Sequence, residues 1–355
     1  MAEWMLYGAN GYSGELIARE ARQRGMSPIL AGRNAGPVNA LGQELGCATR
    51  IFALTDPETI QRHLTDVRLV LLCAGPFSTT SHAMLEACKR TATAYLDITG
   101  EIAVFESIFR QAPALIQAGV VALPGVGFDV VPTDCLAALL KRELPDATRL
   151  RLLFASKKAH VSRGTMLTSL EVVNEPAKMR KDGKIINAAP VVVQIPFDDQ
   201  AAPALRLSWG DVSTAFYSTG IPTIETYIGT PALIKRLRQT TRLRRALGLG
   251  PIQALVKAYY GRALHGPSES ERADDETIVW GEVSNDEGRK VALKLRTPAA
   301  YSLTVDSAVT AVARVLAGDL APGVYTPSLA FGPDFVLGLR GVQGPLAAAA
   351  SAGDA

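Results

Sequence analysis

A glycine-rich turn close to Met1 is the feature that most restricts how this chain can fold. A short apolar run, Met5–Tyr7, favours a β-strand, and the glycines Gly8, Gly11 and Gly14 follow it directly, before a helical pattern. Glycine permits a tight turn at the first position, close approach of a pyrophosphate at the second and close packing of helix on strand at the third. We therefore predict a dinucleotide site formed by Gly8, Asn10, Gly11, Tyr12, Ser13 and Gly14.

The context of this turn supports the same interpretation. Through the first 130 residues, runs that favour strands alternate with helical patterns, which is typical of parallel strands joined by helical crossovers. We predict an α/β fold with an N-terminal Rossmann domain over residues 1–130. The expected strands are Met5–Tyr7, Pro28–Ala31, Thr49–Phe52, Leu69–Cys73, Ala94–Ile98 and Gly119–Leu123, and the expected helices are Gly14–Arg24, Val38–Leu45, Pro57–Leu64, Ser81–Arg90 and part of Ile102–Ala118.

The pattern changes near Leu150, and the length of 355 residues also favours two domains. Residues 131–300 are expected to form an α+β substrate or dimerisation domain with a mostly antiparallel sheet. A helix at Tyr301–Ala317, within a segment 301–340, should return to the Rossmann domain, and residues 341–355 should form a flexible tail. The expected strands are Arg149–Ala155, Val191–Ile195, Leu205–Trp209, Thr223–Gly229, Glu276–Val283 and Lys290–Arg296.

The end of the second strand indicates which cofactor binds. NAD-specific Rossmann domains place an acidic residue there to bind the ribose 2′-hydroxyl, whereas this chain has Arg33 and Asn34. Arginine can hold a 2′-phosphate through charge-assisted hydrogen bonds, and a carboxylate would repel it. The sequence therefore predicts NADP(H) as the cofactor.

Other strand ends supply further candidates at the same edge of the sheet. Ala74, Gly75, Pro76 and Phe77 follow the fourth strand, where their backbone should lie beside the nicotinamide ribose. The candidate catalytic residues are Asp97, Glu101 and Asp129, which follow the next two strands. A carboxyl group with a raised pKa can protonate an imine nitrogen or an enolate, as can Tyr12 or His160. The alternative, which the pattern favours for Asp97 and Asp129, is that the carboxylates cap helices or fix loops.

Composition and residue spacing indicate which kinds of partner the chain is expected to bind. The formal net charge of +3 gives no signal for nucleic acid, no metal-spaced histidine cluster occurs, and no apolar run is long enough to span a membrane. We expect a cytoplasmic protein that acts on a small-molecule substrate. The basic stretch Pro231–His265 is interpreted as a solvated helical face in preference to a peripheral membrane contact, and the second sheet is a candidate surface for a homodimer.

Several segments resemble one enzyme family, the saccharopine dehydrogenase-like oxidoreductases, which include bacterial trans-acting enoyl reductases. These segments are the glycine turn, Leu72–Phe77, Tyr95–Glu101, Pro124–Asp134, Ser162–Thr165, Ser218–Pro222 and Trp280–Val283. The resemblance implies a Rossmann domain, an inserted α+β domain and a cofactor cleft, but no single substrate. Carboxylate-binding arginines of the saccharopine-forming enzymes have no assignable position in this chain.

We therefore expect an NADPH-dependent reductase of a C=N or polarised C=C bond in a small-molecule or lipid-like substrate. The alternative is a sensor or scaffold protein that binds NADP(H) without turnover. The polar residues after strands four to six favour the enzyme, because a sensor has no need for them.

Overall fold

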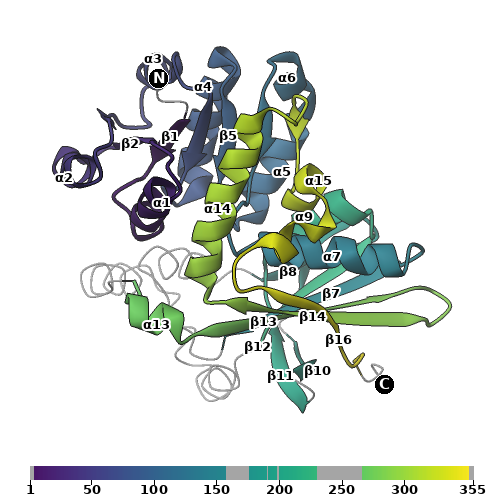
Figure 1. Ribbon diagram of the computed structural model, residues 1–355. Helices are drawn as coiled ribbons and strands as arrows, with labels where there is room; N and C mark the ends of the chain where they lie inside the picture. Colours follow the sequence, from purple (N-terminus) through teal and green to yellow (C-terminus); the bar gives the residue numbers. More distant parts are fainter. Residues whose placement is uncertain (1–3, 157–175, 190, 198–199, 230–265, 352–355) are drawn as a thin grey trace, which may run out of the picture. The chain divides into compact units, whose positions relative to one another are not determined.

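The protein consists of two compact units in the computed structural model (Figure 1). The described residues are 4–156, 176–189, 191–197, 200–229 and 266–351. The first unit combines residues 1–131 with 301–340, and the second combines 132–300 with 341–355. The polypeptide therefore leaves the first unit near residue 131 and re-enters it near residue 301. The basic stretch Pro231–His265, His160 and the segment Ser162–Thr165 lie outside the described residues.

The first unit is built on a parallel sheet of seven strands, which confirms the predicted Rossmann fold. Its order, β15-β6-β5-β4-β1-β2-β3, reverses direction between β1 and β4, the switch point where open α/β sheets bind ligands. The strands are β1 (Trp4–Tyr7), β2 (Ile29–Gly32), β3 (Thr49–Ile51), β4 (Leu69–Leu72), β5 (Ala94–Asp97), β6 (Val121–Leu123) and β15 (Gly323–Val324). The seventh strand, β15, extends the sheet beyond the six strands that the sequence predicts.

Helices cover both faces of this sheet. One face packs against α3 (Pro57–Leu64), α4 (Phe77–Thr91), α5 (Ile102–Arg110) and α6 (Ala112–Gln117). The other face packs against α1 (Tyr12–Gln23), α2 (Ala35–Leu45) and α14 (Ala300–Ala317). Burial on both faces explains why the central strands are apolar along their whole length, as in β4, whose sequence is LVLL.

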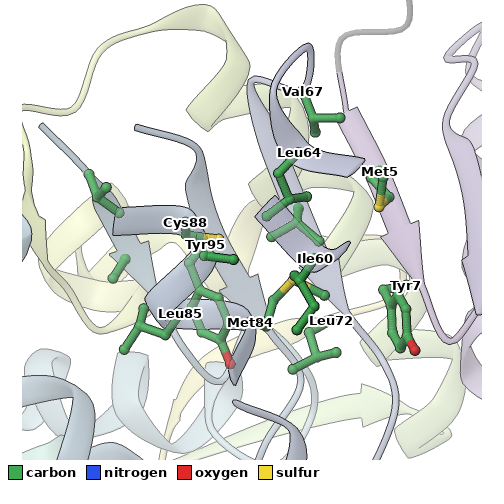
Figure 2. Packing of buried hydrophobic residues seen from close by; sticks show 14 of the residues in the cluster. Met5, Tyr7, Ile60, Leu64, Val67, Leu72, Met84, Leu85, Cys88 and Tyr95 are labelled. Atoms are coloured by element: carbon green, nitrogen blue, oxygen red, sulfur yellow. The ribbon is translucent and has the colours of Figure 1, made fainter. Parts of the chain in front are cut away.

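Alternate residues of each strand enter different core clusters. In β1, Met5 and Tyr7 face α3 and α4, whereas Trp4 and Leu6 face α1 and α14. Figure 2 shows Tyr7 and Tyr95 among the aliphatic side chains of the first cluster. The Tyr95 ring is fully buried there, so its hydroxyl group needs a hydrogen-bonding partner within the protein.

Polar contacts attach α14 to the first unit. The Thr304 hydroxyl accepts a hydrogen bond from the Phe128 N–H (3.0 Å), and the Ser307 hydroxyl donates to the Val126 carbonyl (2.7 Å). The Asp306 carboxylate, buried to 5% exposure, pairs with Arg24 of α1. These contacts hold α14 against both α1 and the loop after β6.

The second unit contains a mixed sheet that is mostly antiparallel, as the sequence predicts. Its main path is β10-β11-β12-β7-β13-β14-β16, with β8 and β9 forming a hairpin beside β12. The strands are β7 (Arg149–Ser156), β8 (Ala177–Lys181), β9 (Lys184–Ala188), β10 (Val192–Phe197), β11 (Gln200–Arg206), β12 (Thr223–Gly229), β13 (Glu276–Ser284), β14 (Lys290–Pro298) and β16 (Gln343–Ala347). The parallel pair within it is β7 with β12.

Helix α7 (Val131–Glu143) packs on this second sheet through a glycine. A Cβ placed on Gly281 would lie 2.6 Å from Leu140 and 3.3 Å from Leu136 of α7. The neighbouring Trp280 is buried on the opposite side of the strand, where its indole N–H donates to the Ala349 carbonyl (3.3 Å). The Trp280–Val283 segment therefore packs against α7 on one side of the sheet, through Gly281, and against the chain near Ala349 on the other, through Trp280.

Several details differ from the sequence prediction. Strand β11 ends at Arg206, and helix α9 (Asp211–Thr219) and the β8–β9 hairpin are additional elements. Three short elements were also not predicted: α13 (Glu269–Ala273), α15 (Pro327–Phe331) and a 3₁₀ turn at Pro333–Gly338. The expectation of a flexible tail from residue 341 is wrong for residues 343–347, because they form β16 and pair with β14. Among the described helices, none combines the length and apolarity needed to cross a membrane.

Candidate cofactor and catalytic site

The glycine turn lies at the switch point of the first sheet, and its geometry requires glycine. Gly8 has a φ of +88°, and a Cβ placed on it would lie 2.8 Å from the Ala74 nitrogen in the loop after β4. A Cβ on Gly14 would lie 2.2 Å from the Gly8 carbonyl oxygen, and one on Gly11 would lie 3.2 Å from the same atom. The turn is thereby pressed between α1 and the loop after β4, with a shallow backbone surface suited to a pyrophosphate.

The start of α1 is suited to an anion. Gly11 is the N-cap residue and has no side chain that could accept hydrogen bonds from the first turn. The acidic residue of that turn, Glu15, is paired with Arg19 at 2.8 Å, so its charge is balanced within the helix. The first-turn N–H groups of Ser13 and Gly14 and the positive end of the helix dipole are therefore oriented toward an incoming phosphate.

The start of α4, at the same switch point, is already bound by a carboxylate of the protein. The two oxygens of Glu101 accept hydrogen bonds from the Phe77 and Ser78 N–H groups, each at 2.8 Å. The Thr80 hydroxyl donates to the Ala74 carbonyl (2.7 Å) and fixes the preceding loop. Glu101, a candidate catalytic residue from the sequence, thus binds a helix N-terminus and positions Gly75, Pro76 and Phe77.

The end of β2 presents a cation and no carboxylate. Arg33 follows Gly32 directly, is exposed, and forms no ion pair within the described part of the chain. Asn34 is the N-cap residue of α2, but its exposed side chain makes no capping hydrogen bond. Asn10 of the glycine turn lies beside this strand end, since a Cβ placed on Gly32 would be 3.1 Å from its Oδ1 atom.

Asp97, at the end of β5, is a buried acceptor for three donors. Its carboxylate accepts hydrogen bonds from the Tyr95 hydroxyl (2.6 Å), the Thr99 N–H (3.0 Å) and the Gly125 N–H (2.9 Å). Burial raises the pKa of this carboxyl to about 6, although the three hydrogen bonds oppose that rise. Asp97 therefore joins the β5 loop to the turn at Gly125, whose φ is +78°.

Asp129 lies next to the β5 loop as well. A Cβ placed on Gly100 would lie 2.7 Å from its Oδ2 atom, so Gly100 leaves room for this carboxyl group. Asp129 is partly exposed, and desolvation raises the pKa of its carboxyl to about 7. At neutral pH a fraction of Asp129 therefore carries a proton that can be transferred.

The remaining sequence candidates have different surroundings. The Tyr12 ring packs edge to face on Tyr301 of α14, with ring centroids 5.0 Å apart. His160 lies outside the described residues. Within the described residues, no cluster of three or more His, Cys, Asp or Glu side chains is placed to bind a metal ion.

The sequence did not predict three hydroxyl groups that bind this edge of the sheet. They belong to Tyr95 of β5 and to Thr304 and Ser307 of α14. Tyr95 occupies a strand position two residues before Asp97, and that spacing places both side chains on one face. This was an available signal for their hydrogen bond. Thr304 offered no such signal, because its partner is 176 residues away.

We predict that Gly14→Ala lowers the free energy of unfolding by about 1–3 kcal/mol, because the added methyl group has no space beside the Gly8 carbonyl. The matched control is Gly36→Ala in α2, where a Cβ meets nothing within 4 Å. Urea denaturation of the three proteins measures the difference. Equal stability of the two variants would contradict the packing described for the turn.

We also predict a pH-dependent effect of Asp97→Asn on stability. The folded protein raises the pKa of Asp97 to about 6, so it binds this proton more tightly than the unfolded chain does. Ionising Asp97 should therefore lower the free energy of unfolding by roughly 3 kcal/mol as pH rises from about 3 to about 7. Denaturation curves at several pH values should show this fall in the wild type and its loss in the variant. A constant difference between the two proteins across this range is the contrary outcome.

Comparison with known proteins agrees with these motifs. No family model matches the chain. The matched region is 30% identical over 194 residues to a putative trans-acting enoyl reductase of Mycobacterium tuberculosis, covering 50% of this chain and 46% of that protein. It is 30% identical over 152 residues to a probable mitochondrial saccharopine dehydrogenase-like oxidoreductase of Arabidopsis thaliana, covering 37% and 33%. The matches thus span less than half the length of these relatives.

A solved structure shares the whole fold. The saccharopine dehydrogenase (L-Glu forming) of Saccharomyces cerevisiae superimposes with a TM-score of 0.66 at 12% sequence identity, covering 95% of this chain and 96% of that one. At this identity the similarity concerns the fold alone. The sequence matches confirm the resemblance predicted from the motifs, and part of the chain is similar in sequence to saccharopine dehydrogenase-like oxidoreductases and trans-acting enoyl reductases.

Proposed function

We propose that this chain is an NADPH-dependent reductase of a C=N or polarised C=C bond in a small-molecule or lipid-like substrate. The observation that carries the proposal is the glycine turn at the sheet's switch point, together with the exposed Arg33 and the absence of a carboxylate at the end of β2. The descriptions of its relatives as trans-acting enoyl reductases and saccharopine dehydrogenase-like oxidoreductases support the reaction class.

The residues of the first unit divide the binding of the cofactor between them. The backbone at Gly8, Gly11 and Gly14 and the start of α1 would hold the pyrophosphate, because the tight turn at these glycines precedes the N–H groups of a helix N-terminus. Arg33 would bind the 2′-phosphate and Asn34 would lie beside it. When bound, the cofactor supplies a hydride, so the protein must orient the nicotinamide and provide a proton.

We assign the proton transfer to Asp129 and give Asp97 and Glu101 positioning roles. The Asp97 carboxylate is fully buried and accepts three hydrogen bonds, and both Glu101 oxygens bind backbone N–H groups. Asp129 is partly exposed at the same edge of the sheet, with a pKa near 7. Its protonated form would deliver a proton to the imine nitrogen or the enolate while the neighbouring carbon receives the hydride.

The same contacts also give weight to a second candidate, a sensor that binds NADP(H) without turnover. Asp97 and Glu101, which favoured an enzyme, are engaged in hydrogen bonds to the backbone or to Tyr95. The polar lining expected of an active site is therefore reduced in this unit. NADPH binding with no oxidation by any imine or enoyl test compound would favour the sensor.

Arg33→Ala should weaken NADPH binding by about 10- to 100-fold and change NADH binding by less than about 3-fold, because NADH lacks the 2′-phosphate. Arg90→Ala, at an exposed position in α4, is the matched control and should leave both affinities unchanged. Fluorescence titration of the reduced nicotinamide gives the dissociation constants. An unchanged preference in Arg33→Ala would rule out its role in cofactor choice.

Asp129→Asn should lower kcat by about 100-fold or more while NADPH affinity changes by less than about 2-fold, because the amide cannot donate the proton as an acid. In the wild type, kcat should fall as pH rises above about 7, where the carboxyl loses its proton, and this dependence should disappear in the variant. NADPH oxidation with a cyclic imine and with an α,β-unsaturated thioester measures both effects. Asp319→Asn, at an exposed position after α14, is the control. Wild-type rates in Asp129→Asn would remove the residue from the mechanism.

A further inference from the structure

The second unit contains a cavity of about 660 Å³ that has no part in the proposed reduction. Its floor is one face of the sheet near the starts of β7 and β12 and the end of β13. One wall is the β8–β9 hairpin, which contributes Met179, Lys181 and Ile186. This hairpin joins the sheet where Arg180 pairs with Ile224, and its turn is held by a hydrogen bond from the Gly183 N–H to the Pro222 carbonyl (2.9 Å). The size is in the range of small-molecule sites.

Strand alternation directs charged side chains into this cavity. In β7, Leu150 and Leu152 are buried, whereas Arg149 and Arg151 lie on the cavity face. In β8, Arg180 is held away from it, since its Nε donates to the Val212 carbonyl at 2.9 Å. Lys181, the next residue, therefore projects toward the cavity.

The carboxylates that line the cavity floor are already engaged. Glu225 pairs with Arg206 and lies 3.5 Å from the Nε of Arg151. Glu282, only 4% exposed, accepts hydrogen bonds from the N–H and hydroxyl of Ser351, the latter at 2.7 Å. These contacts fix the floor in one arrangement, so a ligand would not need to order it.

The cations exceed the acidic groups. Five basic side chains line the cavity against three acidic ones. Arg149 and Lys181 are exposed and form no ion pair with any residue in the described ranges. Thr223 and Ser284 are the register neighbours of Arg149 on the two adjoining strands, and they add hydroxyl groups beside its guanidinium.

One further donor lacks a partner. The Nε of Arg206 is buried and makes no hydrogen bond, although the two terminal nitrogens of the same side chain contact Ala189 and Glu225. Because this nitrogen is buried, it is an unsatisfied donor inside the protein and not a direct contact for a ligand in the cavity. The cavity thus presents guanidinium, ammonium and hydroxyl donors in excess over its free acceptors.

We propose that this cavity is a binding site for a compact polyanion, a small molecule that carries a phosphate or several carboxylates. Arg149 and Lys181 bind the anionic group from two sides, and Thr223 and Ser284 donate hydrogen bonds to it. The carboxylate shared by Arg151 and Arg206 holds both guanidinium groups in place beneath the ligand. This site lies entirely on residues of the second unit and does not depend on the proposed reductase activity.

Isothermal titration of the full chain with pyrophosphate, and separately with citrate, tests the proposal at low ionic strength. Saturating NADPH is present so that the glycine turn is not the site observed. We expect saturable binding of at least one probe, weakened about 10-fold by Lys181→Gln and by Arg149→Gln. Stronger binding of pyrophosphate assigns a phosphate-bearing ligand, and stronger binding of citrate assigns a carboxylate-bearing one.

Lys184→Gln is the matched control, because Lys184 pairs with Lys181 across the same hairpin but does not line the cavity. It should leave both affinities unchanged. Equal weakening by Lys184→Gln, or no saturable binding of either probe in the millimolar range, would overturn the proposal.

Dissociation of a homodimer by Lys181→Gln in sedimentation velocity would also overturn it, because a second copy of the chain would then be the occupant of the cavity. Circular dichroism confirms that each variant is folded, so a loss of binding is assigned to the site. If NADPH itself fails to bind, a lower affinity of Lys181→Gln than of Lys184→Gln for the anionic probe still shows that the probe binds in this cavity.

Discussion

The contact between the Gly8 carbonyl and the first turn of α1 at Gly14 is the constraint on which the first unit depends. A single added carbon at Gly14 would approach that oxygen to 2.2 Å, so the helix can lie this close to the strand end only without a side chain. The closeness fixes the direction of α1 and brings the turn against the loop after β4. The close approaches of Gly14 to the Gly8 carbonyl and of Gly8 to the Ala74 backbone therefore bring the start of α1 close to the loop that precedes Gly75.

The acidic residues at this edge of the sheet have different surroundings. Glu101 neutralises the start of α4, which leaves the start of α1 as the positive helix end at the switch point. Asp97 ties two loops together from a fully buried position. Asp129 differs from both, since it is partly exposed and desolvation raises the pKa of its carboxyl to about 7.

Local patterns were sufficient to predict the parallel sheet, but not the contacts made across long stretches of chain. Six strands of the first unit are short runs that favour strands, bounded by turn residues, so their pattern identifies them, whereas the two-residue strand β15 has no such pattern. Helix α9 was missed because Asp211–Thr219 contains β-branched and aromatic residues that favour strands. Strand β16 was missed because its residues are all exposed, and backbone pairing with β14, almost fifty residues earlier, is what holds it. The hydrogen bonds of Glu101 to the Phe77 and Ser78 N–H groups were likewise not predicted, because they depend on the folded positions of β4 and β5.

The interrupted path of the chain through the first unit has a consequence for how the molecule is made. Helix α14 covers a sheet face that includes Leu96, Leu123 and Val126, yet it is synthesised more than 170 residues after that face. A ribosome adds residues from the N-terminus at about 5–20 per second, so this apolar surface stays uncovered for roughly ten seconds or more while the second unit is made. During that interval the nascent first unit is an incomplete domain whose exposed face is a natural target for a chaperone.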